Sequence, residues 1–352
     1  MLKKTLFPLL CLSLFISCAK ENPQISAGCE LMPNGTYLIK WETFPHIDGT
    51  VQIYESNRPD SFNLDIPVSE QNIREGYKRV LAMHTFARTY FKLVFNKKYS
   101  VITANRELNM QGIFNFRDLG GYNNNANKQI QWGKLYRSGS LSMATQADIA
   151  LLNKLGIETI IDLRTEKESF FSPNKFKAPQ VYNLPLRGNP HNLFFDEILS
   201  QKMKREDILA YDQDLFSFLL ENNTDYFIKL FDILLEEKNY PAVIYCSLGK
   251  DRTAIASALI LAALNVNEDI ILDDYLLSNN LINFHSLVQN ADVYPMEVQE
   301  TITALFRAHK ETINYSLDLI KDNFGSVDNY FEKELNLTHK KREKLKSLLL
   351  YP

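Results

Sequence analysis

The chain has 352 residues, 45% of them hydrophobic, with a formal net charge of −3. This length and composition allow two folded domains with substantial cores. The charge is not basic, which argues against nucleic acid as a partner. The six histidines are scattered without ligand spacing, so we expect neither a metal nor another cofactor.

The N-terminus has the pattern of a targeting segment. Lys3 and Lys4 precede an apolar run at 6–16 that is too short to cross a bilayer. The run leads to Ser17-Cys18, which resembles a bacterial lipobox. This resemblance implies a lipoprotein signal at 1–17 and a lipid anchor on Cys18, in the bacterial cell envelope on the periplasmic face or the cell surface. The alternative is a plain signal peptide with a chance cysteine.

The next segment is predicted to be a small all-β domain. Residues 18–28 are polar and predict a tether, and residues 29–105 carry β-branched and aromatic runs. Asn34-Gly35 and Asp48-Gly49 are hairpin signals. The predicted strands are 36–42, 50–55, 88–95 and 99–104. With Trp41 on an early strand, the segment resembles a fibronectin type III or immunoglobulin-like sandwich, for which we expect a spacer or docking role.

From residue 106 to 352, strands and helices are predicted to alternate, which is typical of an α/β domain with a central sheet flanked by helices. Thr145 is a plausible N-cap for a helix over 145–155. Two further helix-like segments fall within 193–238. The other predicted elements are a hairpin of 128–132 with 135–137, buried strands at 157–163 and 242–245, and a buried helix at 254–264.

The loop between the predicted strand 242–245 and the predicted helix 254–264 contains the residues that indicate a chemical function. Cys246 precedes Arg252 by six residues, and the intervening loop contains one glycine. Such a loop can aim backbone N–H groups and a helix N-terminus at one point, where they would bind an oxyanion. The same field should lower the pKa of Cys246, and Arg252 can grip two phosphate oxygens. The combination predicts a cysteine-dependent phosphatase.

The loop resembles the protein tyrosine phosphatase superfamily, and most closely its bacterial tyrosine phosphatase family. Further stretches match that family in the same order along residues 108–352. They are Asn115-Phe116-Arg117-Asp118-Leu119-Gly120-Gly121, Tyr136-Arg137-Ser138-Gly139, Ile160-Ile161-Asp162-Leu163-Arg164-Thr165 with Glu168, Asp274-Tyr275-Leu276-Leu277-Ser278-Asn279 and Phe324-Gly325-Ser326-Val327. Two departures stand out: Tyr245 replaces the histidine that usually braces the cysteine loop, and Ala254 replaces a glycine.

The resemblance implies a mechanism and a set of site residues. Cys246 would attack phosphorus to form a phosphocysteine, and the amides of 247–252 with Arg252 would stabilise the phosphate oxygens. The substrate-binding residues would be Ser247, Leu248, Gly249, Lys250, Thr253 and Arg117. The hydroxyl of Thr253 would hydrogen-bond the thiolate, and 193–220 would form a helical lid over the pocket.

Several roles stay open at this point. The general acid is assigned to Asp251, with Asp207, Asp212 and Asp214 as alternatives. Lys250 at the rim suggests a substrate with more than one phosphate, or it lowers the pKa of Cys246. Arg117 either contacts phosphate or forms a buried pair with Asp118.

The expected activity is that of a protein tyrosine or dual-specificity phosphatase. Three alternatives are kept: a phosphoinositide or inositol phosphate phosphatase, a pseudophosphatase that only binds phosphorylated ligands, which Tyr245 motivates, and a lipoprotein that docks through its β-domain.

Overall fold

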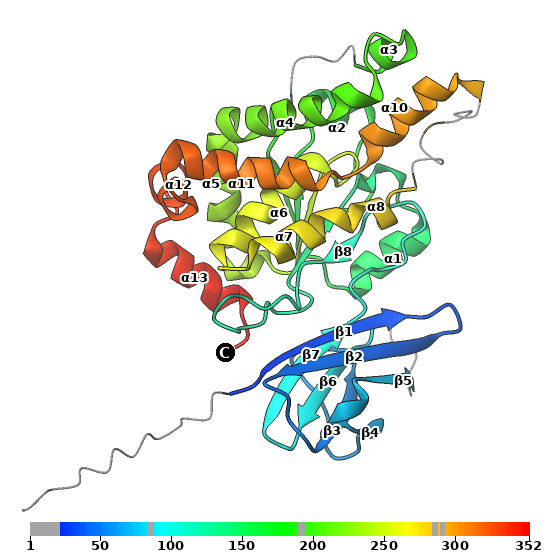
Figure 1. The fold of residues 1–352 in the computed structure, drawn as a ribbon, viewed down its shortest axis with the longest axis vertical. Helices are drawn as coiled ribbons and strands as arrows, with labels where there is room; N and C mark the ends of the chain where they lie inside the picture. Colours follow the sequence, from blue (N-terminus) through cyan, green and yellow to red (C-terminus); the bar gives the residue numbers. More distant parts are fainter. Residues whose placement is uncertain (1–21, 83–87, 189–193, 284–287, 289–292) are drawn as a thin grey trace, which may run out of the picture.

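The structure is a computed structural model that describes residues 22–82, 88–188, 194–283, 288 and 293–352 (Figure 1). The predicted signal and the anchor candidate Cys18 lie outside these residues. A strand-rich N-terminal region sits below a larger region of mixed strands and helices. Within the described residues, no helix is long and apolar enough to cross a membrane.

The N-terminal region, residues 24–104, consists of two antiparallel sheets that share one core. One sheet has the order β1-β2-β5 and the other the order β4-β3-β6-β7. The side chains of Trp41, Ile53 and Phe91 meet in the core between them. The strands are β1 Gln24–Leu31, β2 Thr36–Phe44, β3 Thr50–Ser56, β4 Ser69–Asn72, β5 Tyr77–Leu81, β6 Tyr90–Phe95 and β7 Tyr99–Ala104.

Strand β1 corrects the predicted tether. It begins at Gln24, within the segment 18–28 that was predicted to be a tether because its residues are polar. It pairs along its whole length with β2. Ile25, Ala27 and Cys29 alternate inward against polar or small residues that face outward. This period of two is the signal of a half-buried strand, and the polar residues between them obscured it.

The C-terminal region, residues 106–352, is built around a five-stranded sheet of order β11-β10-β12-β9-β8. Its first four strands are parallel, and β8 is antiparallel to β9. Strand β12 lies at the centre with every residue buried. The strands are β8 Arg117–Asp118, β9 Leu135–Ser138, β10 Thr159–Asp162, β11 Gln180–Asn183 and β12 Ala242–Tyr245.

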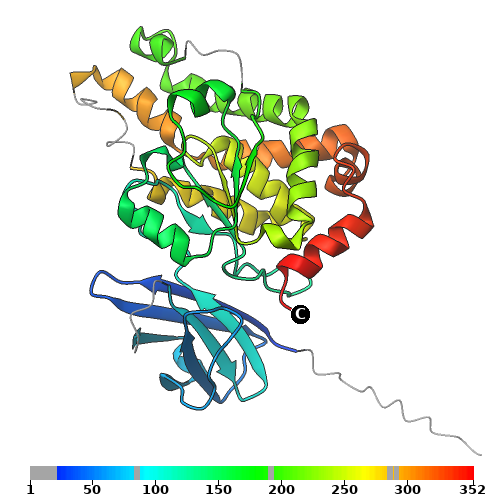
Figure 2. The same ribbon diagram turned by 180° about the vertical axis from the view of Figure 1, so that it is seen from behind.

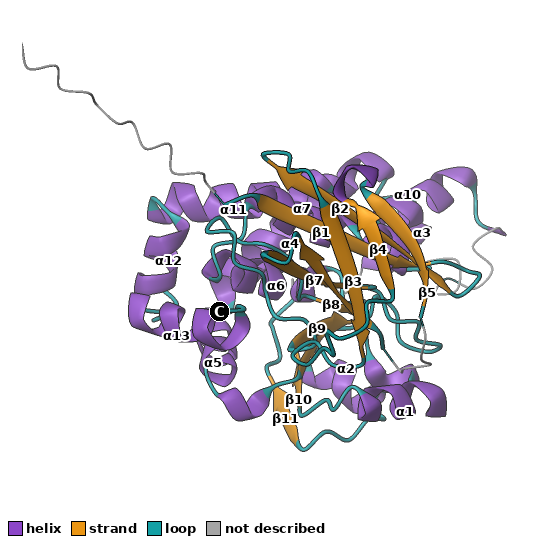
Figure 3. Cartoon of the chain, turned by 90° about the horizontal axis from the view of Figure 1, so that it is seen from below, coloured by secondary structure: helices purple, strands orange, loops and turns teal. Residues whose placement is uncertain are grey.

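Helices cover both faces of this sheet (Figures 1 and 2). Val243 and Tyr245 pack on the side of α1, whereas Ile244 and Cys246 face the larger cluster that includes α5, α6 and α7. The helices are α1 Gln146–Lys154, α2 Glu166–Phe171, α3 Phe194–Leu199, α4 Arg205–Asn222, α5 Thr224–Leu234, α6 Asp251–Ala263, α7 Glu268–Leu276, α8 Ser278–Leu281, α10 Met296–Phe306, α11 Lys310–Phe324, α12 Val327–Lys333 and α13 His339–Leu349. In Figure 3, which is coloured by secondary structure, the N-terminal region consists mainly of strands, whereas helices predominate in the C-terminal region.

The predicted hairpin of 128–132 with 135–137 does not form. Strand β9 is present, but it pairs with β8 and β12 instead. Residues 128–132 instead contact the β-region, because the side chains of Gln129 and Trp132 both donate to the carbonyl of Ile102 at 2.9 Å. Within the C-terminal region, Ile130 forms an isolated β-bridge with Leu350. Tertiary partners therefore overrode the local strand pattern.

A buried ion pair also joins the two regions. Arg88, just before β6, donates to Asp118 of β8 at 2.6 Å and to the Tyr136 hydroxyl at 3.0 Å. Both charged side chains are almost fully buried. The Arg88 guanidinium also lies over the rings of Tyr90 and Trp132. The β-region therefore packs directly against the C-terminal region, next to strands β8 and β9.

Candidate active site

The cysteine loop leaves the central strand β12 and runs directly into α6. Cys246 follows the strand and is 3% exposed, and α6 begins at Asp251. Gly249 has a φ of +68°, and a Cβ there would lie 2.3 Å from the backbone oxygen of Ser138. Only glycine fits this turn without strain.

Two backbone carbonyl groups of the cysteine loop accept hydrogen bonds from neighbouring segments. The oxygen of Ser247 accepts from the amide of Ser140 at 2.9 Å. The oxygen of Gly249 accepts from Asn115 Nδ2 at 2.9 Å and from Arg137 at 2.7 Å. Because C=O and N–H point in opposite directions across a planar trans peptide, the amides that follow face the other way. Amides of 247–250 donate to no other described residue, so they are free to bind an anion.

A buried carboxylate fixes the residues that hold the loop. Asp274 of α7 pairs with Arg117 at 3.1 Å and with Arg137 at 2.5 Å, and all three side chains are at most 1% exposed. Burial alone would raise the pKa of Asp274, but the two guanidinium groups hold it well below its usual range. This network connects β8, β9 and α7 to the cysteine loop.

The two candidate residues of the Asn115–Gly121 motif are structural. Arg117 is fully buried against Asp274 and does not line the cleft, which corrects its predicted contact with phosphate. Asp118 does not pair with Arg117 as the alternative interpretation expected. It accepts from Arg88 and from the amides of Gly120 and Gly133. Successive residues of a strand point to opposite faces of the sheet, which separates the Arg117 and Asp118 side chains from each other.

Arg252 is held in a two-pronged ion pair with Glu168. Its two terminal nitrogens donate to the Glu168 oxygens at 2.6 and 2.7 Å, and one of them also donates to the Ser247 hydroxyl at 3.2 Å. Burial would raise the pKa of Glu168, but the hydrogen bonds and charge of Arg252 hold it well below its usual range. Glu168 also caps α2 by accepting from the amide of Thr165. The capping box therefore aims a carboxylate at the arginine.

Tyr245 has a defined role in place of the expected histidine. Its hydroxyl donates to Asp162 at 2.6 Å and accepts from Arg164 at 3.1 Å. Asp162 is its register partner on the adjacent strand β10 and is itself paired with Arg164 at 2.8 Å. Tyr245 therefore braces the end of β12 through a buried network without carrying a charge.

Lys250 is not at the rim of the cleft. Its ammonium group is buried and donates to the carbonyls of Leu305 and Arg307, at the C-terminus of α10, at 2.6 and 3.1 Å. It also forms an ion pair with Asp251 at 3.4 Å. A cation at a helix C-terminus is favourable, so this lysine ties α10 to the loop and cannot reach a second phosphate from this position.

Asp251 is the candidate acid that the structure places at the cleft. Its side chain is 24% exposed and lines the cleft. Asp212 is buried beside Lys250 and Asp251, whereas Asp207 and Asp214 are exposed on α4 and do not line the cleft. The hydroxyl of Thr253 is buried and has no hydrogen-bond partner among the described residues, so its predicted bond to the thiolate is not formed here.

A cleft of about 880 Å³ opens above the loop. Ser247, Asp251 and Arg252 line its base, and α2 contributes Lys167 and Glu168. The remaining lining residues that matter here form an apolar wall: Phe171, Tyr211, Leu215 and Leu219. The last three belong to α4, within the segment predicted to cover the pocket.

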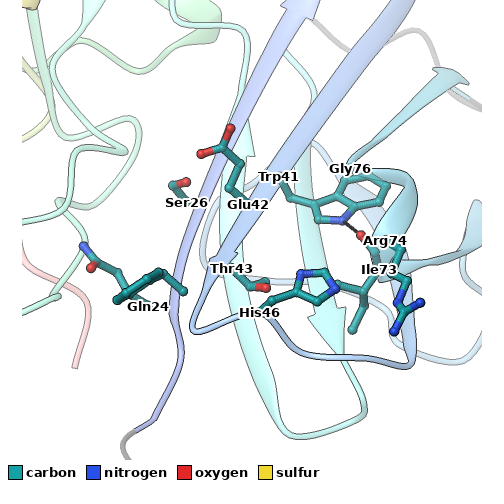
Figure 4. Close-up of a pocket in the computed structure, with 10 residues that line it drawn as sticks. Gln24, Ser26, Trp41, Glu42, Thr43, His46, Ile73, Arg74 and Gly76 are labelled. Carbon is teal, nitrogen blue, oxygen red and sulfur yellow. Dashed lines mark hydrogen bonds between the residues drawn. The ribbon is translucent and has the colours of Figure 1, made fainter.

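A second hollow, of about 510 Å³, lies in the β-region (Figure 4). It is lined by β1 and β2 and by the turn that carries Ile73 and Arg74. The Trp41 indole donates to the Ile73 carbonyl at 2.8 Å, which uses its one donor internally. No predicted site residue borders this hollow. Among the described residues, no three His, Cys, Asp or Glu side chains gather as a metal site would require.

Comparison with known proteins supports what the geometry indicates. The sequence profile described as tyrosine phosphatase family matches residues 108–351. The chain belongs to the tyrosine phosphatase family. It is 27% identical over 242 residues to a tyrosine-protein phosphatase of Cupriavidus necator, covering 67% of this chain and 86% of that protein. It is 27% identical over 201 residues to the triple specificity protein phosphatase PtpB of Mycobacterium tuberculosis, covering 51% and 71%.

Solved structures with some similarity include two phosphatases. One is the core catalytic domain of a PP-IP phosphatase from S. cerevisiae in complex with citrate, at 16% identity and a TM-score of 0.28, covering 61% of this chain and 96% of that one. The other is a phosphatase from Neisseria meningitidis, at 19% identity and a TM-score of 0.26, covering 43% and 88%.

Sequence reasoning overlooked three residues of this phosphatase site. The family motif contains Glu168 without giving it a role, although the Thr165-x-x-Glu168 spacing after a buried strand is a capping-box signal. Asn115 and Asp274 also lay in matched stretches without a role. Their contacts with Gly249 and with two arginines join segments more than a hundred residues apart, which no local pattern reveals.

Proposed function

We propose that the chain is an active phosphatase whose preferred substrates are phosphotyrosine residues of proteins. The observation that carries this proposal is the cleft, in which an apolar wall of Phe171, Tyr211, Leu215 and Leu219 stands beside the Arg252–Glu168 pair. An aryl ring can pack on such a wall while its phosphate enters the loop. The burial of Lys250 supports the same preference, because it removes the expected contact for a second phosphate.

In the proposed reaction, Cys246 Sγ forms a bond to phosphorus as the bond to the tyrosine oxygen breaks. Asp251 gives that oxygen its proton. The free amides of the loop and the Arg252 guanidinium stabilise the equatorial oxygens of the phosphate. The two hydrogen bonds from Arg252 to Glu168 fix the orientation of that guanidinium. Water then attacks the phosphocysteine, the bond from phosphorus to sulfur breaks, and one proton of the water returns to Asp251, which releases the Cys246 thiolate and inorganic phosphate.

The test measures phosphate release by the full-length chain from a phosphotyrosine peptide and from a phosphoinositide, with chelator present. Cys246→Ser should abolish release from the peptide. Cys29→Ser is the matched control, because that cysteine lies in β1 and outside the cleft, and it should leave release unchanged. Faster release from the phosphoinositide would contradict the substrate preference. Binding of the peptide without release would indicate a pseudophosphatase.

We also propose that the phosphatase is held in the cell envelope by a lipid on Cys18, on the strength of the lipobox-like sequence. Cys18→Ala should move the protein from the membrane fraction to the soluble fraction of lysed cells. An unchanged membrane fraction would contradict lipid anchoring at this residue. The β-region would then act as a spacer, since the cleft lies at the opposite end of the molecule, near α2 and α4 (Figure 1).

A further inference from the structure

The proposed acid Asp251 belongs to a group of three charged side chains, and the other two, Lys250 and Asp212, are almost fully buried. Lys250 and Asp251 form an ion pair at the start of α6, and Asp212 of α4 interacts electrostatically with both. Asp212 is 1% exposed, and its Oδ2 has no hydrogen-bond partner among the described residues. A buried carboxylate without partners is costly, whereas a neutral carboxylic acid is tolerated.

The charge balance of this group favours one bound proton. Two carboxyl groups face one ammonium group, so full ionisation would leave one negative charge uncompensated in a buried place. Burial raises the pKa of Asp212, Asp251 raises it further, and Lys250 opposes the shift. The acid on α4 is therefore the favoured place for the proton when the cleft is empty.

Among the described residues, Arg252 is the other cation that interacts with Asp251, and its charge is already paired with Glu168. The other titratable groups that interact with Asp212 are Tyr211 of α4 and Tyr275 of α7, and burial raises the pKa of both. From α10, which packs on α4, the Leu305 carbonyl reaches Lys250, as does that of Arg307 just beyond it. The His309 ring, just before α11, is hydrogen-bonded to the Ala304 carbonyl. The Arg205–Glu300 pair between α4 and α10 is exposed to solvent.

We propose that Asp212 is a positioning residue for proton transfer, holding in common with Asp251 the one proton that Asp251 delivers to the leaving oxygen. As the bond from phosphorus to that oxygen breaks, the pair gives up its proton and both carboxylates face Lys250. When water attacks the phosphocysteine, one of its protons returns to the pair. The inference rests on the proposed phosphatase activity.

The experiment compares Asp212→Asn with the unaltered full-length chain over a range of pH. Without the second carboxylate, the group no longer contains two negative charges facing one ammonium group, so the alkaline limb of the kcat profile should move to lower pH. At neutral pH, kcat for a phosphotyrosine peptide should fall about tenfold, less than the ~10²-fold or greater loss expected for Asp251→Asn. The fall should be much smaller for p-nitrophenyl phosphate, whose leaving group needs less protonation.

A double variant separates this role from a structural one. If both residues act through one proton, Asp212→Asn should cause no further loss in the Asp251→Asn background. Glu221→Gln, at an exposed position on the same helix, is the matched control and should change neither profile. Equal losses on both substrates with an unmoved alkaline limb would overturn the proposal. No release by the unaltered chain would instead refute the proposed phosphatase activity.

Discussion

The core between the two sheets of the β-region and the interior of the phosphatase region contain different kinds of side chain. The first is apolar, with residues such as Trp41, Val51 and Phe95. The second buries apolar clusters too, but it adds Arg117, Arg137, Asp274 and Lys250 at almost zero exposure. Burying charges is costly, and a hydrophobic replacement often stabilises a fold as well or better. We therefore interpret these buried charges as groups that fix the geometry of the cysteine loop, and not as groups that stabilise the fold in general.

The sharpest test of this contrast is Arg252→Lys. Lysine keeps the charge but loses the planar fork that pairs with Glu168 and would grip phosphate. We expect kcat on a phosphotyrosine peptide to fall by about 10²–10³-fold. Arg187→Lys, in an exposed pair with Asp225, should leave the rate unchanged. A change confined to KM would show that Arg252 binds ground state and transition state alike.

Asp274→Asn should have the largest effect on stability. It leaves Arg117 and Arg137 buried without their counter-charge. We expect the free energy of unfolding to fall by about 3–5 kcal/mol, as measured by urea denaturation. Asp225→Asn, at a half-exposed pair, should cost far less. Equal costs at the two sites would remove the distinction between the buried network and ordinary surface pairs.

Leu93→Ala probes the other region. This side chain is fully buried between the two sheets, and its truncation should cost about 2–5 kcal/mol of unfolding free energy. Measured well below its melting temperature, kcat should equal that of the unaltered chain, because no residue of this core lines the cleft. A matching fall in kcat would mean that the β-region shapes the site through the Arg88–Asp118 junction.

Tyr245→Phe should have a moderate effect. It removes the hydroxyl from Asp162 and Arg164 but leaves those two paired with each other. We expect a loss of about 1–2 kcal/mol in urea denaturation, with little change in kcat. A large fall in kcat would show that the tyrosine acts on the cysteine loop as well as on the strand.

The smallest expected effect concerns the pH dependence of stability. The pKa of Glu168 is lowered in the folded chain, so its pairing with Arg252 contributes stability that is fully present above the ordinary carboxyl pKa, about 4.3. That contribution is lost as the pH falls from there toward the folded-state pKa. Glu168→Gln should therefore reduce stability at pH 7 and flatten its acid dependence in thermal melts. An identical acid slope in both proteins would contradict this assignment.

Local signals in the sequence predicted the parts of the site that are local in the chain. The predicted strand at 242–245 matches β12, and Thr145 caps α1 as predicted. Cys246 and Arg252 interact electrostatically because they lie at the two ends of one short loop between β12 and α6. What the sequence could not predict depends on distant partners. The carbonyls of α10 draw Lys250 away from the rim, Asp274 takes Arg117, and segment 128–132 exchanges its hairpin for contacts at the junction.

The junction around Arg88 also has a mechanical consequence. A guanidinium clamped between a carboxylate and aromatic rings resists bending far more than a linker does. If the β-region is the proposed spacer, its orientation would set the orientation of the cleft, which lies near α2 and α4 at the other end of the molecule (Figure 1). A lipid anchor at Cys18 would then determine not only where the phosphatase is held but also which way its cleft faces.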